Sequence, residues 1–98
     1  MVSWYITYRV TLTGDPAVMA EYSSKVNATI ELYGGRKIVR TDDIAVIEGD
    51  WDPERMTVIE FPDRAAALRW YNSPEYAPLK EMRHGVSTAN AIIVDSME

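Results

Sequence analysis

The stretch that decides the fold runs from Thr57 to Gly85 and reads TVIEFPDRAAALRWYNSPEYAPLKEMRHG. Residues 55–61 are rich in β-branched and aromatic side chains, which is typical of a strand. Asp63 then has the position and chemistry of a helix N-cap. One face of the helix that follows carries Ala66, Ala67, Trp70, Tyr71 and Pro74. Ser73 and Pro74 predict the start of a further helical segment, which Gly85 ends.

Upstream of this stretch, the sequence predicts a strand followed by a helix. Residues 3–12 alternate, with Trp4, Ile6 and Tyr8 on one face and Tyr5 and Thr7 on the other. An N-cap at Asp15 and a proline at the first helical position predict a helix from Pro16 to about Tyr33. Its apolar stripe consists of Met19, Tyr22, Val26, Ile30 and Tyr33. The glycines at 34 and 35 end it.

The middle of the chain predicts two more strands and an arm. Residues 36–41 read as a strand, a turn is expected at Asp42 and Asp43, and residues 44–48 extend or re-enter the same sheet edge. A loop surrounds Trp51, and residues 87–94 form the last strand. The order βαββαβ, with an extra hairpin arm and an extra short helix, indicates a ferredoxin-like α+β sandwich. We expect a four-stranded antiparallel sheet with its helices on one face, in a single domain over residues 1–98.

Composition excludes several functional classes. The chain has 98 residues and a net charge of -5, which argues against binding to nucleic acid or to an anionic membrane. It has no cysteine, so disulfides, thiolate catalysis and cysteine-based metal sites are excluded. No apolar run approaches the roughly 20 residues of a membrane span. We expect a soluble, cytoplasmic protein without a metal site or cofactor.

Apolar residues on both faces of the predicted strands indicate a homodimer. An antiparallel sheet with one wet face should alternate apolar and polar residues. Here Val58 and Ile59 are adjacent, as are Ile92 and Ile93. Packing the uncovered sheet faces of two copies together would remove this surface from water. A monomer with scattered exposed apolar residues is the alternative.

Motifs in sequence order strengthen this interpretation. They are Tyr33 to Arg36 (YGGR), Glu48 to Trp51 (EGDW), Val58 to Pro62 (VIEFP), Trp70 to Tyr76 (WYNSPEY), and Arg83. Together they resemble the domain of unknown function 1330 family, in the dimeric α+β barrel superfamily. The resemblance implies a ferredoxin-like protomer, a dimer with face-to-face sheets, and a cleft in each protomer. It supplies no catalytic residues, because the family has no assigned reaction.

One departure from the family's pattern concerns the last helix. Pro78 stands where members usually continue with a good helix former. Since proline removes a backbone hydrogen bond and crowds the preceding turn, we expect a break, with a fresh helix starting near Pro78. This leaves the positions of Arg83 and His84 open.

Two residues are candidate proton acceptors. His84 is the only histidine, and it could act as a general base or a haem ligand, or could simply cap a helix C-terminus. Glu60 lies late in a strand that should be central, where a carboxylate is costly unless paired. It could be a general base or one member of an ion pair at the dimer interface.

Three residues are candidate ligand-binding groups. Arg36 and Arg40 on the second predicted strand would clamp a carboxylate, or would tie protomers together through ion pairs. Tyr33 places a hydroxyl beside the glycine turn. Trp70 is expected in the core, and Trp51 is expected to pack over a neighbour or a partner.

The sequence therefore predicts a small homodimer with a cleft that binds a small anionic or aromatic molecule, and its residues allow cofactor-free acid–base chemistry there. A non-enzymatic binding or structural dimer is the first alternative. A haem-degrading enzyme or cofactor-free monooxygenase is the second.

Overall fold

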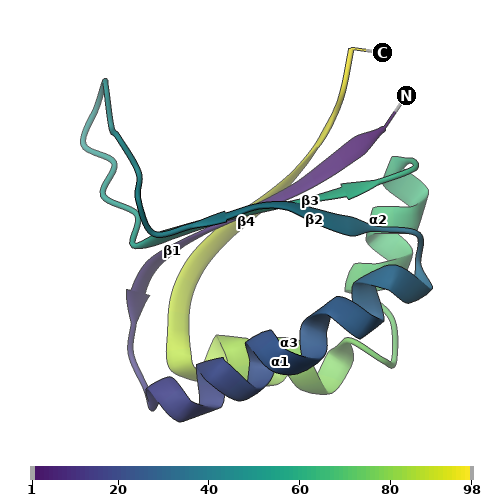
Figure 1. Cartoon of the computed structure of the whole chain (residues 1–98), viewed down its shortest axis with the longest axis horizontal. Coiled ribbons are helices and arrows are strands. Elements are labelled where there is room, and N and C mark those ends of the chain that lie inside the picture. Colours follow the sequence, from purple (N-terminus) through teal and green to yellow (C-terminus); the bar gives the residue numbers. More distant parts are fainter. Residues whose placement is uncertain (1, 98) are drawn as a thin grey trace.

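The computed structural model describes residues 2–97, and its elements follow the predicted order. The strands and helices are β1 (Ser3–Leu12), α1 (Pro16–Leu32), β2 (Arg36–Thr41), β3 (Arg55–Phe61), α2 (Arg64–Tyr71), α3 (Ala77–Val86) and β4 (Ser87–Asp95). The strands form one sheet in the order β2-β3-β1-β4, and every neighbouring pair is antiparallel. All three helices lie on the same side of this sheet (Figure 1). The predicted ferredoxin-like α+β fold is confirmed.

The helix boundaries arise from the capping residues that the sequence indicated. The Asp15 carboxylate accepts a hydrogen bond from the backbone N–H of Ala17 at 2.9 Å, and Asp63 accepts from the N–H of Ala66 at 2.8 Å. After α1, Gly34 adopts a positive φ of 79°, which only glycine takes without strain. Helix α3 begins at Ala77 with Pro78 in its first turn, as expected from the proline.

The core lies where α2 and the end of α1 cover the sheet. Its centre is the indole of Trp70, which is fully buried and contacts the rings of Tyr5, Phe61 and Tyr76. The Trp70 Nε1–H donates to the hydroxyl of Thr29 at 3.0 Å, so the one polar atom of the indole is satisfied. We call these four aromatic residues and Tyr71 the aromatic core.

Two sequence expectations about local structure are wrong. Residues 44–48 form no strand; they belong to an irregular arm between β2 and β3 that projects from the sheet (Figure 1). Their apolar run resembles a strand, but no neighbouring strand pairs with it. Gly85 does not end α3 in a left-handed cap, because the helix continues to Val86. Ser87 then leaves the helix in an extended conformation.

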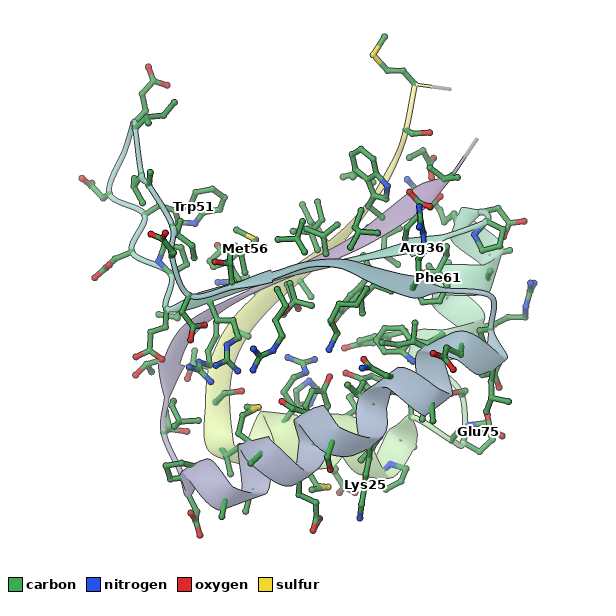
Figure 2. All side chains as sticks on the ribbon, in the orientation of Figure 1. Lys25, Arg36, Trp51, Met56, Phe61 and Glu75 are labelled. Atoms are coloured by element: carbon green, nitrogen blue, oxygen red, sulfur yellow. The ribbon has the colours of Figure 1, made fainter. Side chains whose placement is uncertain are left out.

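The side of the sheet away from the helices, here called the open face, is largely apolar. Strand registers place on it Trp4, Ile6, Tyr8, Met56, Val58, Ile92 and Val94. Figure 2 shows Met56 and Arg36 on this side, with Trp51 of the arm near Met56 and Arg36 toward the other end of the sheet. The Trp51 ring packs edge-on against Tyr8 with centroids 4.8 Å apart, which confirms that it covers a neighbour. No element among residues 2–97 covers the rest of the open face.

Candidate functional site

A cleft lies between the helix-facing side of the sheet and the first half of α1. Its floor includes Tyr5, Thr57 and Ile59 from the strands, and its wall includes Met19 and Val26 from α1. The cavity volume is about 50 Å³. Since a single water needs about 10–15 Å³ by this measure, the enclosed part of the cleft is equivalent to a few water molecules. It suits a small ligand.

Cationic side chains dominate the polar lining of this cleft. Within the described part of the chain, the lining includes five of them: Arg9, Lys37, Arg40, Arg55 and Arg83. Strands β1, β2 and β3 supply the first four, and α3 supplies the last. None of the described lining residues is a carboxylate or a histidine. So many like charges in one cleft are unfavourable unless an anion joins them.

A β-bulge decides which residues of β2 reach the cleft. The register between β2 and β3 shifts between Lys37 and Val39. Because side chains on a strand alternate, one extra residue moves everything after it to the other face. Lys37 and Arg40 therefore both face the helices, opposite Ile59 and Thr57 respectively.

Carboxylates neutralise two of the five cations. Arg9 Nε lies 3.1 Å from Glu54 Oε1. Arg55 makes a two-pronged pair with Asp42, at 2.6 Å from Nε and 3.1 Å from Nη2. Among residues 2–97, no carboxylate lies within 4.0 Å of Lys37, Arg40 or Arg83; this leaves three positive charges without a counter-charge.

The most buried of these cations is Arg83, whose residue surface is only 7% exposed. Its guanidinium donates to the hydroxyls of Tyr76 at 3.3 Å and Tyr5 at 3.4 Å. Its Nη2 also lies 3.3 Å from Nε2 of His84. Since a guanidinium can only donate, Nε2 accepts, and the imidazole is neutral with its proton on Nδ1.

The environment perturbs several titratable groups of the cleft. Burial raises the pKa of Tyr5 to about 12, partly offset by the Arg83 charge. Burial also raises the pKa of Tyr22, whose hydroxyl lies 2.8 Å from that of Tyr76. Both phenols therefore stay protonated at neutral pH. Burial lowers the pKa of Lys37, and the nearby charges of Arg40 and Arg55 lower it further.

Of the five residues that the sequence suggested for a site, only Arg40 lines this cleft. Arg36 and Glu60 face each other across β2 and β3 on the open face, with Arg36 Nη2 at 3.3 Å from Glu60 Oε1. Trp4 Nε1–H also donates to Glu60, at 3.4 Å. Glu60 is thus paired within its own protomer, and its use as a proton acceptor stays a prediction.

The other two suggested residues lie apart from each other and do not line the cleft. The hydroxyl of Tyr33 donates to Glu75 at 2.5 Å, in the segment between α2 and α3. His84 is exposed on α3, and its pKa is lowered by partial burial and by the charges of Arg83 and Lys80. Its low proton affinity fits an acceptor for the Arg83 guanidinium.

Sequence reasoning missed Arg83, Lys37 and Arg55 as cleft residues. A signal for Arg83 was available, because it shares one buried helical stripe with Leu79 and Val86. A charged residue at such a position needs a polar partner or a ligand. Lys37 had no comparable signal, because the face it takes depends on how β2 pairs with β3.

Other kinds of site are not apparent in residues 2–97. No group of three or more histidine, cysteine, aspartate or glutamate side chains is arranged to hold a metal ion. No described helix has the length and apolar character needed to cross a membrane.

Comparison with known proteins identifies the family and the fold. A family described as Domain of unknown function (DUF1330) matches residues 3–97. No curated protein matches the chain. Among solved structures, the RPA0582 protein of unknown function from Rhodopseudomonas palustris is 15% identical, with a TM-score of 0.79 over 99% of this chain and 83% of that one.

Two further solved structures resemble the chain at low identity. SnoaB, a cofactor-independent oxygenase from Streptomyces nogalater, is 18% identical, with a TM-score of 0.67 over 99% of this chain and 93% of that one. A dimeric protein of unknown function with a ferredoxin-like fold, from Bacteroides fragilis, is 11% identical, with a TM-score of 0.59 over 97% of this chain and 95% of that one. At these identities the likeness establishes the fold alone.

Proposed function

The chain belongs to the family described as Domain of unknown function (DUF1330), and because that description gives no reaction, we propose a function from the geometry of the cleft. The protein binds a small organic anion in the cleft between the sheet and α1. The observation that carries this proposal is the charge of the lining: half of the ten lysines and arginines of an acidic chain line one small cleft. Three of these five have no carboxylate partner among residues 2–97.

The chemistry of the lining favours binding over proton abstraction. The phenols of Tyr5 and Tyr22 hold their protons at neutral pH, so they donate hydrogen bonds and do not act as bases. Arginine is always charged. A carboxylate or other oxyanion would accept hydrogen bonds from these groups, and the apolar side chains of Met19, Val26 and Ile59 would contact its carbon chain.

Calorimetric titration tests this function. Acetate, propionate, benzoate and inorganic phosphate are the probes, and a primary amine of matching size is the cation control. We expect at least one anion to bind and the amine not to bind. Absence of binding by every anion at millimolar concentration would contradict the proposal.

The open face supports a second part of the proposal, a homodimer formed by two sheets packed face to face. Ile92 is 55% exposed and Val39 is 39% exposed on this face, beside the partly exposed Met56 and Val58. A solved structure with this fold is described as dimeric. The cleft opens on the opposite side of the sheet, so dimerisation leaves it accessible.

The position of Glu60 favours a role at the dimer interface over a catalytic role. It lies on the open face and not in the cleft, so its place in a dimer is at the interface. We expect Glu60→Gln to lower the denaturation midpoint in a manner that depends on protein concentration. If the midpoint is independent of concentration in both proteins, the interface role is wrong.

A cofactor-free oxygenase is a second candidate function, because SnoaB, which resembles nearly the whole chain, is described as one. Oxygen consumption by the purified protein with phenolic substrates would support it. The haem-degrading alternative requires an available His84, whereas its Nε2 accepts from Arg83. A Soret band on haem addition that is lost in His84→Gln would support that alternative. Cytoplasmic location stays a prediction.

A further inference from the structure

We propose that the ligand of the cleft carries two anionic groups, and that it is a short dicarboxylate with one carboxylate at Arg83 and the other at Lys37 and Arg40. This inference rests on the proposed anion-binding function and names the substrate class of that site. It comes from the number of unneutralised cations and from their division into two centres.

The charge of the lining exceeds what a monoanion can neutralise. Of the five cations, Arg9 is paired with Glu54 and Arg55 is paired with Asp42. Lys37, Arg40 and Arg83 remain, and no carboxylate of residues 2–97 lies within 4.0 Å of them. A monocarboxylate would leave two charges unmatched in a partly buried site, whereas a dicarboxylate leaves one.

The inner centre is Arg83 on α3. Its guanidinium is buried against the hydroxyls of Tyr5 and Tyr76, which are neutral acceptors. The Tyr5 hydroxyl accepts from Arg83 and shares a hydrogen bond of 3.1 Å with the Thr7 hydroxyl. A planar carboxylate in the cleft would accept from this phenol and from the guanidinium together. This arrangement provides the missing counter-charge of Arg83.

The outer centre consists of Lys37 and Arg40 on β2. Lys37 faces the helices opposite Ile59, and the bulge that follows it turns Arg40 toward the helices as well. Lys37 is half-buried, and Arg40 is exposed at the mouth. Lys37 and Arg40 lie on β2 opposite Ile59 and Thr57, whereas Arg83 lies on α3 against the hydroxyls of Tyr5 and Tyr76. The two cationic centres therefore have different neighbours.

Size limits the distance between the two anionic groups of the ligand. A cavity of about 50 Å³ excludes a large aromatic skeleton. The wall and floor between the polar groups include the apolar side chains of Met19, Val26 and Ile59. A short methylene chain fits this lining, and a carboxylate at each end can reach a different element of the fold.

Calorimetric titration of the intact protein separates a dianion from a monoanion. The probes are malonate, succinate and glutarate, each compared with a monocarboxylate of the same chain length, and inorganic phosphate as a compact dianion. We expect the best dicarboxylate to bind at least about tenfold more tightly than its matched monocarboxylate, since one further charge-assisted contact contributes on this scale.

Variants assign the two ends. Lys37→Gln should weaken the best dicarboxylate by about tenfold while changing its matched monocarboxylate by less than about threefold. Lys25→Gln, which removes an exposed lysine outside the cleft lining, should change neither. Arg83→Lys keeps the charge but loses the two-pronged geometry, so it should weaken both ligands. If Arg83→Lys fails to fold, Lys37→Gln and its control Lys25→Gln still test whether the second carboxylate binds at the outer centre.

Distinct outcomes overturn the inference and the function on which it rests. Equal affinity for dicarboxylates and matched monocarboxylates overturns the two-group ligand but leaves anion binding intact. Tighter binding of phosphate than of every dicarboxylate overturns the ligand class. An unchanged dicarboxylate affinity in Lys37→Gln overturns the outer centre. Failure of every anion to bind overturns both proposals.

Discussion

Under α2 the space between helix and sheet is filled by the rings of the aromatic core, whereas under the first half of α1 it is a cleft lined by cations. Both regions lie on the same face of the same sheet and share Tyr5. In the aromatic core, Trp70 is fully buried with its polar atom satisfied. In the cleft, Lys37, Arg40 and Arg83 have no carboxylate of residues 2–97 within 4.0 Å. One part of the layer is therefore tightly packed, whereas the other contains the cleft in which we propose that a ligand binds.

The aromatic core should give the largest stability effect. Trp70→Ala removes an indole that contacts the four other aromatic residues of the core, and we expect a loss of about 3–5 kcal/mol in the free energy of unfolding. Trp51→Ala is the matched control, because that indole is 54% exposed. Urea denaturation measures both. Comparable losses in the two variants would contradict the assignment of the core to α2.

Thr29 tests the polar contact within the same region. Thr29→Val keeps the shape but removes the acceptor of the Trp70 N–H, leaving a buried donor unsatisfied. We expect a loss of about 1–3 kcal/mol in the free energy of unfolding. Thr88→Val on β4 is the control, since Thr88 is exposed. A neutral result at Thr29 would show that the indole finds another acceptor.

Gly35 and Gly85 allow a comparison between a glycine packed against side chains and a glycine with open space around it. A Cβ at Gly35 would lie 2.6 Å from Phe61 Cε1 and 2.8 Å from Ile30 Cγ2, so Gly35→Ala should cost about 1–3 kcal/mol. A Cβ at Gly85 would meet nothing within 4 Å, and Gly85→Ala in the last turn of α3 should gain about 0.5–1 kcal/mol. Thermal denaturation of both variants checks the opposite signs; equal signs would contradict the packing described here.

His84 should give the smallest effect, a pH dependence of stability. Its pKa in the folded protein is lowered below the usual value of 6.5, mainly by partial burial and then by the charges of Arg83 and Lys80. The unfolded chain therefore binds more protons in this window, and stability falls as pH drops from 6.5 through the folded pKa. Denaturation midpoints between about pH 7.5 and about pH 5 measure the slope.

The matched variant for this effect is His84→Gln, whose amide oxygen can still accept from Arg83. We expect the variant to lose the part of the slope that arises in this pH window. If the denaturation midpoint has the same slope against pH in both proteins, folding does not shift the pKa of His84.

Much of the fold could be predicted from the sequence, because its signals are local. Asp15, Asp63, the glycines after α1 and Pro78 set helix boundaries through their own chemistry. The strand expected over residues 44–48 of the arm was wrong, because an apolar run of strand-like residues does not specify a pairing partner. Strand assignment depends on non-local pairing that propensity alone does not supply.

The site was less predictable, for a physical reason that β2 illustrates. Arg36 and Arg40 are four residues apart, so regular alternation puts them on one face. The bulge after Lys37 separates them, placing Arg36 with Glu60 on the open face and Arg40 in the cleft. A bulge depends on how two strands pair, and the sequence of one strand does not reveal it. The register of Lys37 could be known only from the structure.

The side-chain titration of Lys37, followed by NMR with and without saturating succinate, tests the central claim most directly. The account predicts that Lys37 in the free protein titrates below 10.5, and that succinate raises its midpoint because a carboxylate neutralises the surrounding cations. A Lys37 midpoint that is not below 10.5 and is unmoved by succinate would contradict the account.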